Sequence, residues 1–161
     1  AVLLGTSLVF EPKELGLMRR PPRPPDEPIL DRIAVVRTVI VSSLIAGSAF
    51  GLFWYADQSG DYTVEQARTI AANTIIVVEV GYLFACRSLR LPIWRLGWFT
   101  NHWVWVGATL TLLAQLAFSY LPVMNELFHT QPIPLWWWGA FTAAGGLVFV
   151  VVEIKKALTA S

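Results

Sequence analysis

The sequence predicts an all-α membrane protein with four complete transmembrane helices, preceded by a truncated half helix. Of the 161 residues, 55% are hydrophobic and 14% are charged, whereas soluble domains carry about a quarter charged residues. The mean hydropathy is +0.56. Four apolar runs are each long enough to cross a hydrocarbon core of about 30 Å at ~1.5 Å per residue.

The expected elements follow one another along the chain. Residues 1–10 are apolar but too short to span a membrane. We interpret them as the end of a helix, so the chain is expected to be a piece of a larger protein. Residues 11–32 form a polar connector whose six prolines disfavour a regular helix. The four spans are expected at 33–56, 69–86, 103–121 and 136–152.

Local signals mark several helix boundaries and contacts. Thr63 is a candidate cap for the helix that enters the second span, and Pro122 should close the third. Three consecutive tryptophans at 136–138 are typical of an interfacial girdle. Gly145 and Gly146 favour close helix approach, with a kink as the alternative.

The distribution of basic residues supports this segmentation. One side of the predicted topology holds eleven of the twelve Lys and Arg residues, and the other holds only Arg68. The positive-inside rule therefore predicts that the proline-rich loop and the C-terminus are cytoplasmic. We expect an integral protein of a bacterial plasma membrane. The eleven residues are Lys13, Arg19, Arg20, Arg23, Arg32, Arg37, Arg87, Arg90, Arg95, Lys155 and Lys156.

Glu79 is the most informative single residue, because it lies deep inside an otherwise apolar run between Thr69 and Cys86. An ionised side chain at such a depth costs a few kcal/mol or more, and intramembrane carboxylates usually face a bundle interior or an ion pathway. Two roles stay open for Glu79. It is either a transport residue that binds a cation, or a protonated side chain that bonds a neighbouring helix.

Other kinds of site are absent from the sequence. A lone cysteine, Cys86, excludes an intramolecular disulfide, and His102 and His129 lack metal-ligand spacing. There is no phosphate-binding glycine loop, dinucleotide turn or nucleophile elbow. The dispersed basic residues form no nucleic-acid-binding pattern. We therefore expect no catalytic residues, no cofactor and no nucleic-acid partner for this piece by itself.

The connector carries a specific pattern: Phe10-Glu11-Pro12, then Met18-Arg19-Arg20-Pro21-Pro22-Arg23, then Glu27-Pro28-Ile29-Leu30. It resembles the loop after the sixth transmembrane helix of P-type cation-transporting ATPases. Three later stretches are similar to the same family in order and spacing. They are Ala67-Arg68-Thr69 leading to Asn73-Thr74 and Glu79, then Cys86-Arg87-Ser88, and finally Val152-Glu153-Ile154-Lys155-Lys156.

The resemblance implies the C-terminal transport region of a calcium-pump-like P-type ATPase, from the end of the sixth helix through the tenth. The parent would be an ATPase that uses Mg-ATP and moves a cation, calcium or another. Glu79 matches the acidic ligand that the eighth helix supplies in calcium pumps. Ala1 falls where those pumps keep a sixth-helix aspartate, so the resemblance leaves the ion and the stoichiometry open.

Further roles are assigned more generally. Asn73, Tyr82 and Gln115 are candidates for helix packing or for supporting the cation ligand. Arg19, Arg20 and Arg23 either couple the loop to the phosphorylation domain, as the resemblance implies, or contact anionic lipid. The expected partners are the bilayer and the remaining helices and cytoplasmic domains of a pump.

One alternative gives the chain a different function. It would be a self-standing multi-spanning membrane subunit or scaffold, with Glu79 only holding helices together. A half of a secondary transporter is disfavoured, since no inverted internal similarity or pair of broken helices is evident.

Overall fold

The computed structural model describes residues 2–12, 32–88 and 93–159, and the described part of the chain is built from helices without strands. Four long helices have the length and apolar composition needed to cross a membrane, which confirms the predicted all-α membrane class. The elements are α1 (Val2–Ser7), η1 (Leu8–Phe10), α2 (Arg32–Ser59), α3 (Val64–Cys86), α4 (Ile93–Leu96), α5 (His102–Tyr120), α6 (Pro122–Phe128) and α7 (Trp137–Thr159).

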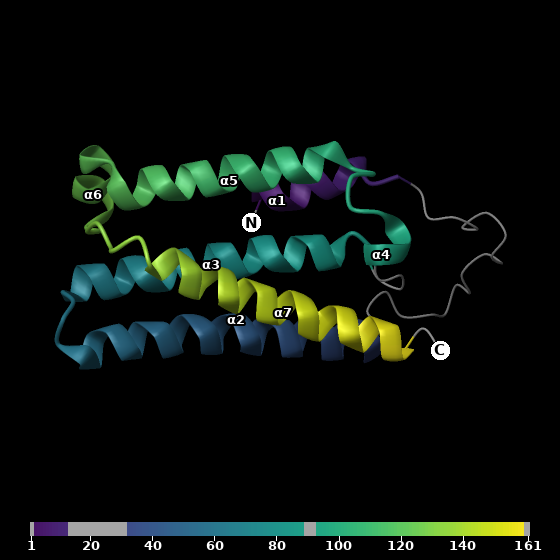
Figure 1. The fold of residues 1–161 in the computed structure, drawn as a ribbon, viewed down its shortest axis with the longest axis horizontal. Helices are drawn as coiled ribbons and strands as arrows, with labels where there is room; N and C mark the ends of the chain where they lie inside the picture. Colours follow the sequence, from purple (N-terminus) through teal and green to yellow (C-terminus); the bar gives the residue numbers. More distant parts are fainter. Residues whose placement is uncertain (1, 13–31, 89–92, 160–161) are drawn as a thin grey trace, which may run out of the picture.

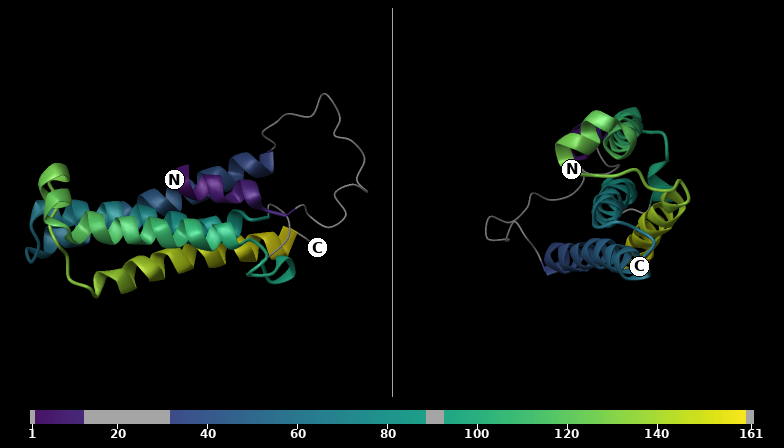
Figure 2. Two further views of the ribbon diagram at one scale, coloured as in Figure 1. Left: turned by 90° about the horizontal axis from the view of Figure 1, so that it is seen from above. Right: turned by 90° about the vertical axis from the view of Figure 1, so that its left-hand side faces the viewer.

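The long helices α2, α3, α5 and α7 run side by side along the bundle (Figure 1). The α2–α3 connection and α6 lie at one end, called here the α6 end, while α4 and the last turn of α7 lie at the other. Seen along the bundle, α3 occupies the centre (Figure 2). Half of the residues in the most apolar stretch of α3 are buried, against 11% in that of α2. α3 is therefore the element around which the others pack.

α3 begins at Val64, five residues before the predicted span of 69–86. Thr63 caps it as predicted: its Oγ1 accepts a hydrogen bond from the Gln66 backbone N–H at 3.2 Å, and the Gln66 side chain accepts from the Thr63 N–H at 3.1 Å. This reciprocal pair satisfies two N–H groups that a helix start leaves open. The cap lets the helix begin within residues 64–68, a partly polar stretch that hydropathy alone places at the membrane interface.

Two other helices continue beyond the ends of the predicted spans. α2 continues to Ser59 instead of 56 and stops where Gly60 adopts a φ of 73°, a left-handed conformation that glycine accepts readily at a helix end. α7 continues to Thr159 instead of 152. Its last turns remain packed because Lys156 is buried and donates to Glu153 Oε1 at 2.6 Å.

The short helices α4 and α6 lie between the predicted spans, where no helix is expected. α6 begins at Pro122, where the missing N–H costs nothing at a first helical position. It ends at Phe128, and the next residue, His129, has a φ of 51°, which is unusual for a residue other than glycine. Pro122 therefore separates α5 from α6 as well as closing α5.

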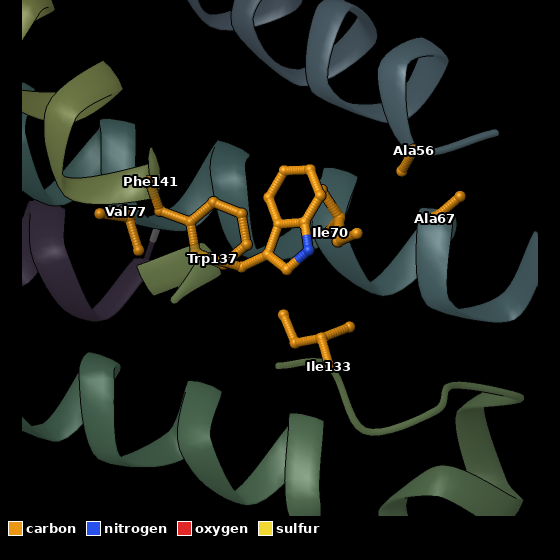
Figure 3. Packing of buried hydrophobic residues seen from close by; sticks show 7 residues of the cluster. All are labelled: Ala56, Ala67, Ile70, Val77, Ile133, Trp137 and Phe141. Atoms are coloured by element: carbon orange, nitrogen blue, oxygen red, sulfur yellow. The ribbon is translucent and has the colours of Figure 1, made fainter. Parts of the chain in front are cut away.

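Three clusters of buried side chains form the core, and α3 contributes to all of them. The largest surrounds Trp137, which is only 1% exposed (Figure 3). This burial corrects the predicted tryptophan girdle at one position: Trp136 is exposed, whereas Trp137 is part of the core. The cluster consists of Ala56, Ala67, Ile70, Val77, Ile133, Trp137 and Phe141.

Glycine allows α3 and α7 to approach closely. A Cβ atom added at Gly81 would lie 2.5 Å from the carbonyl oxygen of Gly145, and one added at Gly145 would lie 2.9 Å from that of Val77. A Cβ atom added at Gly146 would have no other atom within 4 Å. The predicted close approach is thus confirmed for Gly145, with Gly81 as its partner.

Candidate cation site

Glu79 lies in the second half of α3, is partly buried, and lines a cavity of about 330 Å³. Three helical segments form the cavity wall. Besides Glu79 they contribute Leu4, Gly5 and Leu8 from α1 and η1, Thr38, Val41, Ser42 and Ile45 from α2, and Tyr82, Leu83 and Cys86 from α3.

The α3 side of the wall follows from helix geometry. Tyr82, Leu83 and Cys86 lie three, four and seven positions after Glu79, and this spacing places side chains on one face of a helix. The opposite face packs against the rest of the bundle, since Val77 belongs to a core cluster and Gly81 meets α7. Glu79 is therefore on the face of α3 that borders the cavity, together with the predicted supporting residue Tyr82.

The oxygen atoms along this wall suit a hard cation. Glu79 supplies a carboxylate, Thr38, Ser42 and Tyr82 supply hydroxyl groups, and Ca²⁺ takes six to eight oxygen ligands. Among the described residues, no group of three or more His, Cys, Asp or Glu side chains is close enough to hold a metal ion. The described residues thus place one carboxylate and three hydroxyl groups along the cavity wall.

The other two predicted supporting residues lie away from this cavity. Asn73 is fully buried and its Nδ2 donates to Ser119 Oγ at 2.9 Å, which joins α3 to α5. Gln115 is half-buried, and its backbone carbonyl accepts from Ser119 Oγ at 2.9 Å. Ser119 was not singled out from the sequence. A serine in an apolar span gives little signal, because its hydroxyl commonly bonds its own helix.

The predicted coupling residues Arg19, Arg20 and Arg23 lie outside the described residues, and so does Ala1.

Sequence reasoning also missed two buried ion pairs at the end of the bundle opposite α6. Arg87 contacts Glu11, and Lys156 contacts Glu153. The sequence offered a signal in each case, since each pair combines residues from motifs of the family resemblance. The pairing itself could not be predicted, because it depends on how the helices pack.

A family model described as "Cation transporting ATPase, C-terminus" matches residues 1–158. The chain is 46% identical over 159 residues to probable cation-transporting ATPase F of Mycobacterium tuberculosis, covering 98% of this chain and 17% of that protein.

More distant relatives show the same partial coverage. Cation-transporting ATPase pma1 of Synechocystis is 29% identical over 146 residues, 86% of this chain. Calcium-transporting ATPase type 2C member 2 of Mus musculus is 27% identical over 150 residues, 93% of this chain. The chain spans 16% of each of these two relatives, about a sixth of their length.

Proposed function

Since the chain belongs to the cation-transporting ATPase C-terminus family, we propose that it is the C-terminal membrane part of an ATP-driven cation pump. Within that pump Glu79 supplies one carboxylate of the cation site, and the surrounding helices brace the helices that move. The observation that carries this proposal is the position of Glu79 on a cavity shared by α1, α2 and α3. A carboxylate in an apolar span is favourable when a cation binds it.

The division of labour follows from what the described residues offer. They hold too few charged ligands for a complete metal site, so the remaining ligands come from other helices of the pump. Mg-ATP would be used in cytoplasmic domains, where phosphorylation switches the cation site between access from the inside and access from the outside of the membrane. Glu79 then binds a cation or a counter-transported proton, and the hydroxyl groups of Ser42 and Tyr82 lie on the same wall.

The transported ion is calcium or another hard cation. Oxygen ligands suit such ions, and one of the similar proteins is named a calcium-transporting ATPase. We place the pump in a bacterial plasma membrane, with the C-terminus on the cytoplasmic side, because the basic residues gather at that end. Arg19, Arg20 and Arg23 are proposed to couple the proline-rich loop to the phosphorylation domain.

The test is Glu79→Gln in the complete pump. Removing the charge while keeping the size of the side chain should raise the cation concentration that half-activates ATP hydrolysis by about tenfold or more. The measurement is ATPase activity against cation concentration in purified, reconstituted protein. Glu65→Gln is the matched control, since Glu65 lies in the first turn of the same helix and away from the cavity.

The two roles of Glu79 predict different results. A helix-packing role predicts that Glu79→Gln lowers thermal stability and leaves the half-activating concentration at its original value. That outcome would remove Glu79 from the cation site. A raised half-activating concentration at unchanged thermal stability supports the ligand role.

A further inference from the structure

A buried ion pair joins two of the segments that line the Glu79 cavity. Arg87 follows the last residue of α3, its side chain is fully buried, and its Nη2 donates to Glu11 Oε1 at 2.9 Å. Its Nε lies 3.2 Å from both carboxylate oxygens. Glu11 directly follows η1. The pair therefore fastens the end of α1–η1 to the end of α3.

The other donors of Arg87 bind the segment that leads into α5. Nη1 donates to the carbonyl oxygens of Gly97 at 2.9 Å and Trp98 at 3.0 Å, and Nη2 also donates to Thr100 Oγ1. A guanidinium group carries five N–H bonds in a fixed plane. With these partners and Glu11, all its nitrogens are engaged, and the side chain is held in one orientation.

Asn101 completes the connection from the carboxylate side. Its Nδ2 donates to Glu11 Oε2 at 2.7 Å and to the Ser7 carbonyl at 3.2 Å, while its Oδ1 caps α5 by accepting from the Trp103 N–H. Glu11 is thus held by Arg87 and Asn101 together. The ends of three helical segments meet at one carboxylate, near the end of the bundle that lies opposite α6 (Figure 1).

Stability alone does not account for this arrangement. Replacing a buried ion pair by apolar side chains of similar volume is often neutral or stabilising, because the desolvation penalty offsets the attraction. What such a pair does provide is a fixed relative position of the parts that it joins. α1 packs mainly on α5 and contacts α3 less extensively, so its placement against α3 depends strongly on the pair.

The pair adjoins, along the chain, the residues at which the cavity wall ends. On the α1 side the wall ends at Leu8, three residues before Glu11, and on the α3 side it ends at Cys86, next to Arg87. We propose that Glu11 and Arg87 are positioning residues for the cation site. They fix the distance between α1–η1 and α3 at this end of the cavity. In this way they determine which groups of α1–η1 lie across the cavity from the Glu79 carboxylate. The inference rests on the proposed function of Glu79.

The experiment uses Glu11→Gln in the complete pump, alone and combined with Glu79→Gln. Alone, it should raise the half-activating cation concentration by about threefold or more while the maximal rate per folded pump stays within about twofold. Combined with Glu79→Gln it should add no further shift, because the pair acts through Glu79. A purely structural role would not produce this dependence on Glu79.

Glu153→Gln is the matched control. It weakens the other ion pair at this end of the bundle, in which Glu153 also accepts from the Ile93 N–H at 2.8 Å. Both partners of that pair belong to α7, which contributes no residue to the cavity wall. It should lower thermal stability without shifting cation activation. Arg87→Lys keeps the charge but loses the planar fork, so it should shift activation in the same direction as Glu11→Gln.

The outcomes separate this inference from the proposed function. A shift in Glu79→Gln with none in Glu11→Gln, or two shifts that simply add, overturns the positioning role alone. Unchanged activation in Glu79→Gln overturns the proposed function, and the positioning role with it. If Glu11→Gln does not fold, Arg87→Lys carries the test, and unshifted activation in that variant overturns the inference.

Discussion

Asn73 forms a polar contact between α3 and α5 that is fully shielded from solvent. Its Nδ2 donates to Ser119 Oγ at 2.9 Å and to the Thr69 carbonyl at 2.8 Å. Interhelical hydrogen bonds in membranes contribute less than their burial suggests, since the separated helices also find partners. The contact should therefore contribute modestly to stability while fixing the rotation of α5 against α3.

Replacing Asn73 by Leu should lower the free energy of unfolding by about 0.6 kcal/mol, and by no more than ~1.7 kcal/mol. Adding Ser119→Ala should then cost little more, because the shared bond is already lost. The measurement is thermal unfolding of the complete protein in detergent. Thr111→Val is the control, since the buried Thr111 hydroxyl has no hydrogen-bond partner among the described residues. An equal loss in Thr111→Val would contradict the assignment.

Individual residues were predicted to different degrees. Glu79 could be predicted because a charged group in an apolar span is costly and needs a partner, and Asn73 because it lies in a stretch of the family resemblance. Arg87 was predicted as a cytoplasmic charge and as part of a family-like stretch, but its place at the centre of a buried network was not. Its partner Glu11 lies 76 positions away. Pairing at such a separation depends on packing that no local pattern contains.

At the scale of elements, the contact of α3 with α7 depends on Gly81 and Gly145. The backbones meet so closely that a Cβ at Gly81 would lie 2.5 Å from the Gly145 carbonyl oxygen. This partner is backbone, so relief requires movement of a whole helix rather than of one side chain. The core cluster that includes Val78 and Val148, on these same two helices, would be disturbed by that movement.

Gly81→Ala and Gly145→Ala should each lower the free energy of unfolding by about 1–3 kcal/mol, the usual cost of overpacking. Gly146→Ala is the matched control, because nothing lies within 4 Å of a Cβ there. It should be neutral or slightly stabilising, since alanine favours a helix more than glycine does. Chemical or thermal unfolding of the complete protein measures the difference. Equal effects of Gly145→Ala and Gly146→Ala would disprove the close approach.

The existence of the four spans could be predicted, and so could the ends that Thr63 and Pro122 mark. Hydropathy reports the apolar middle of a helix, and the four predicted middles are all helical in the structure. The cap formed by Thr63 and Gln66 is local, so the sequence shows it. The end of α7 could not be predicted, because it depends on buried Lys156, which donates to the Ala85 carbonyl at 2.5 Å across 71 positions of the chain.

For the whole molecule, the long helices are buried to very different extents, as is expected for one part of a larger assembly. α3 is enclosed by its neighbours, whereas α2 presents most of its apolar surface outward, including Phe50 and Trp54. An outward apolar surface of this kind suits contact with lipid or with further helices. The candidate site has the same character: the sequence predicted its carboxylate, but the cavity exists only where three separate segments come together, which no single span encodes.

The orientation of the bundle follows from its charges and can be measured. Arg68 lies near the start of α3, at the α6 end, whereas the basic residues of α4 and of the last turns of α7 lie at the opposite end, so we expect the α6 end outside the cell. Single cysteines would be introduced at Asp61, exposed between α2 and α3, and at Trp94, exposed on α4. The background is the complete pump with its own cysteines, Cys86 included, replaced by serine.

In intact cells, a membrane-impermeant maleimide should label Asp61→Cys and leave Trp94→Cys unlabelled until the membrane is permeabilised. Leu127→Cys, on the exposed surface of α6, should behave like Asp61→Cys because the two lie at the same end. Labelling of Trp94→Cys alone in intact cells would reverse the orientation. Opposite behaviour of Asp61→Cys and Leu127→Cys would contradict the four-span fold itself, since an even number of crossings must return the chain to the same side.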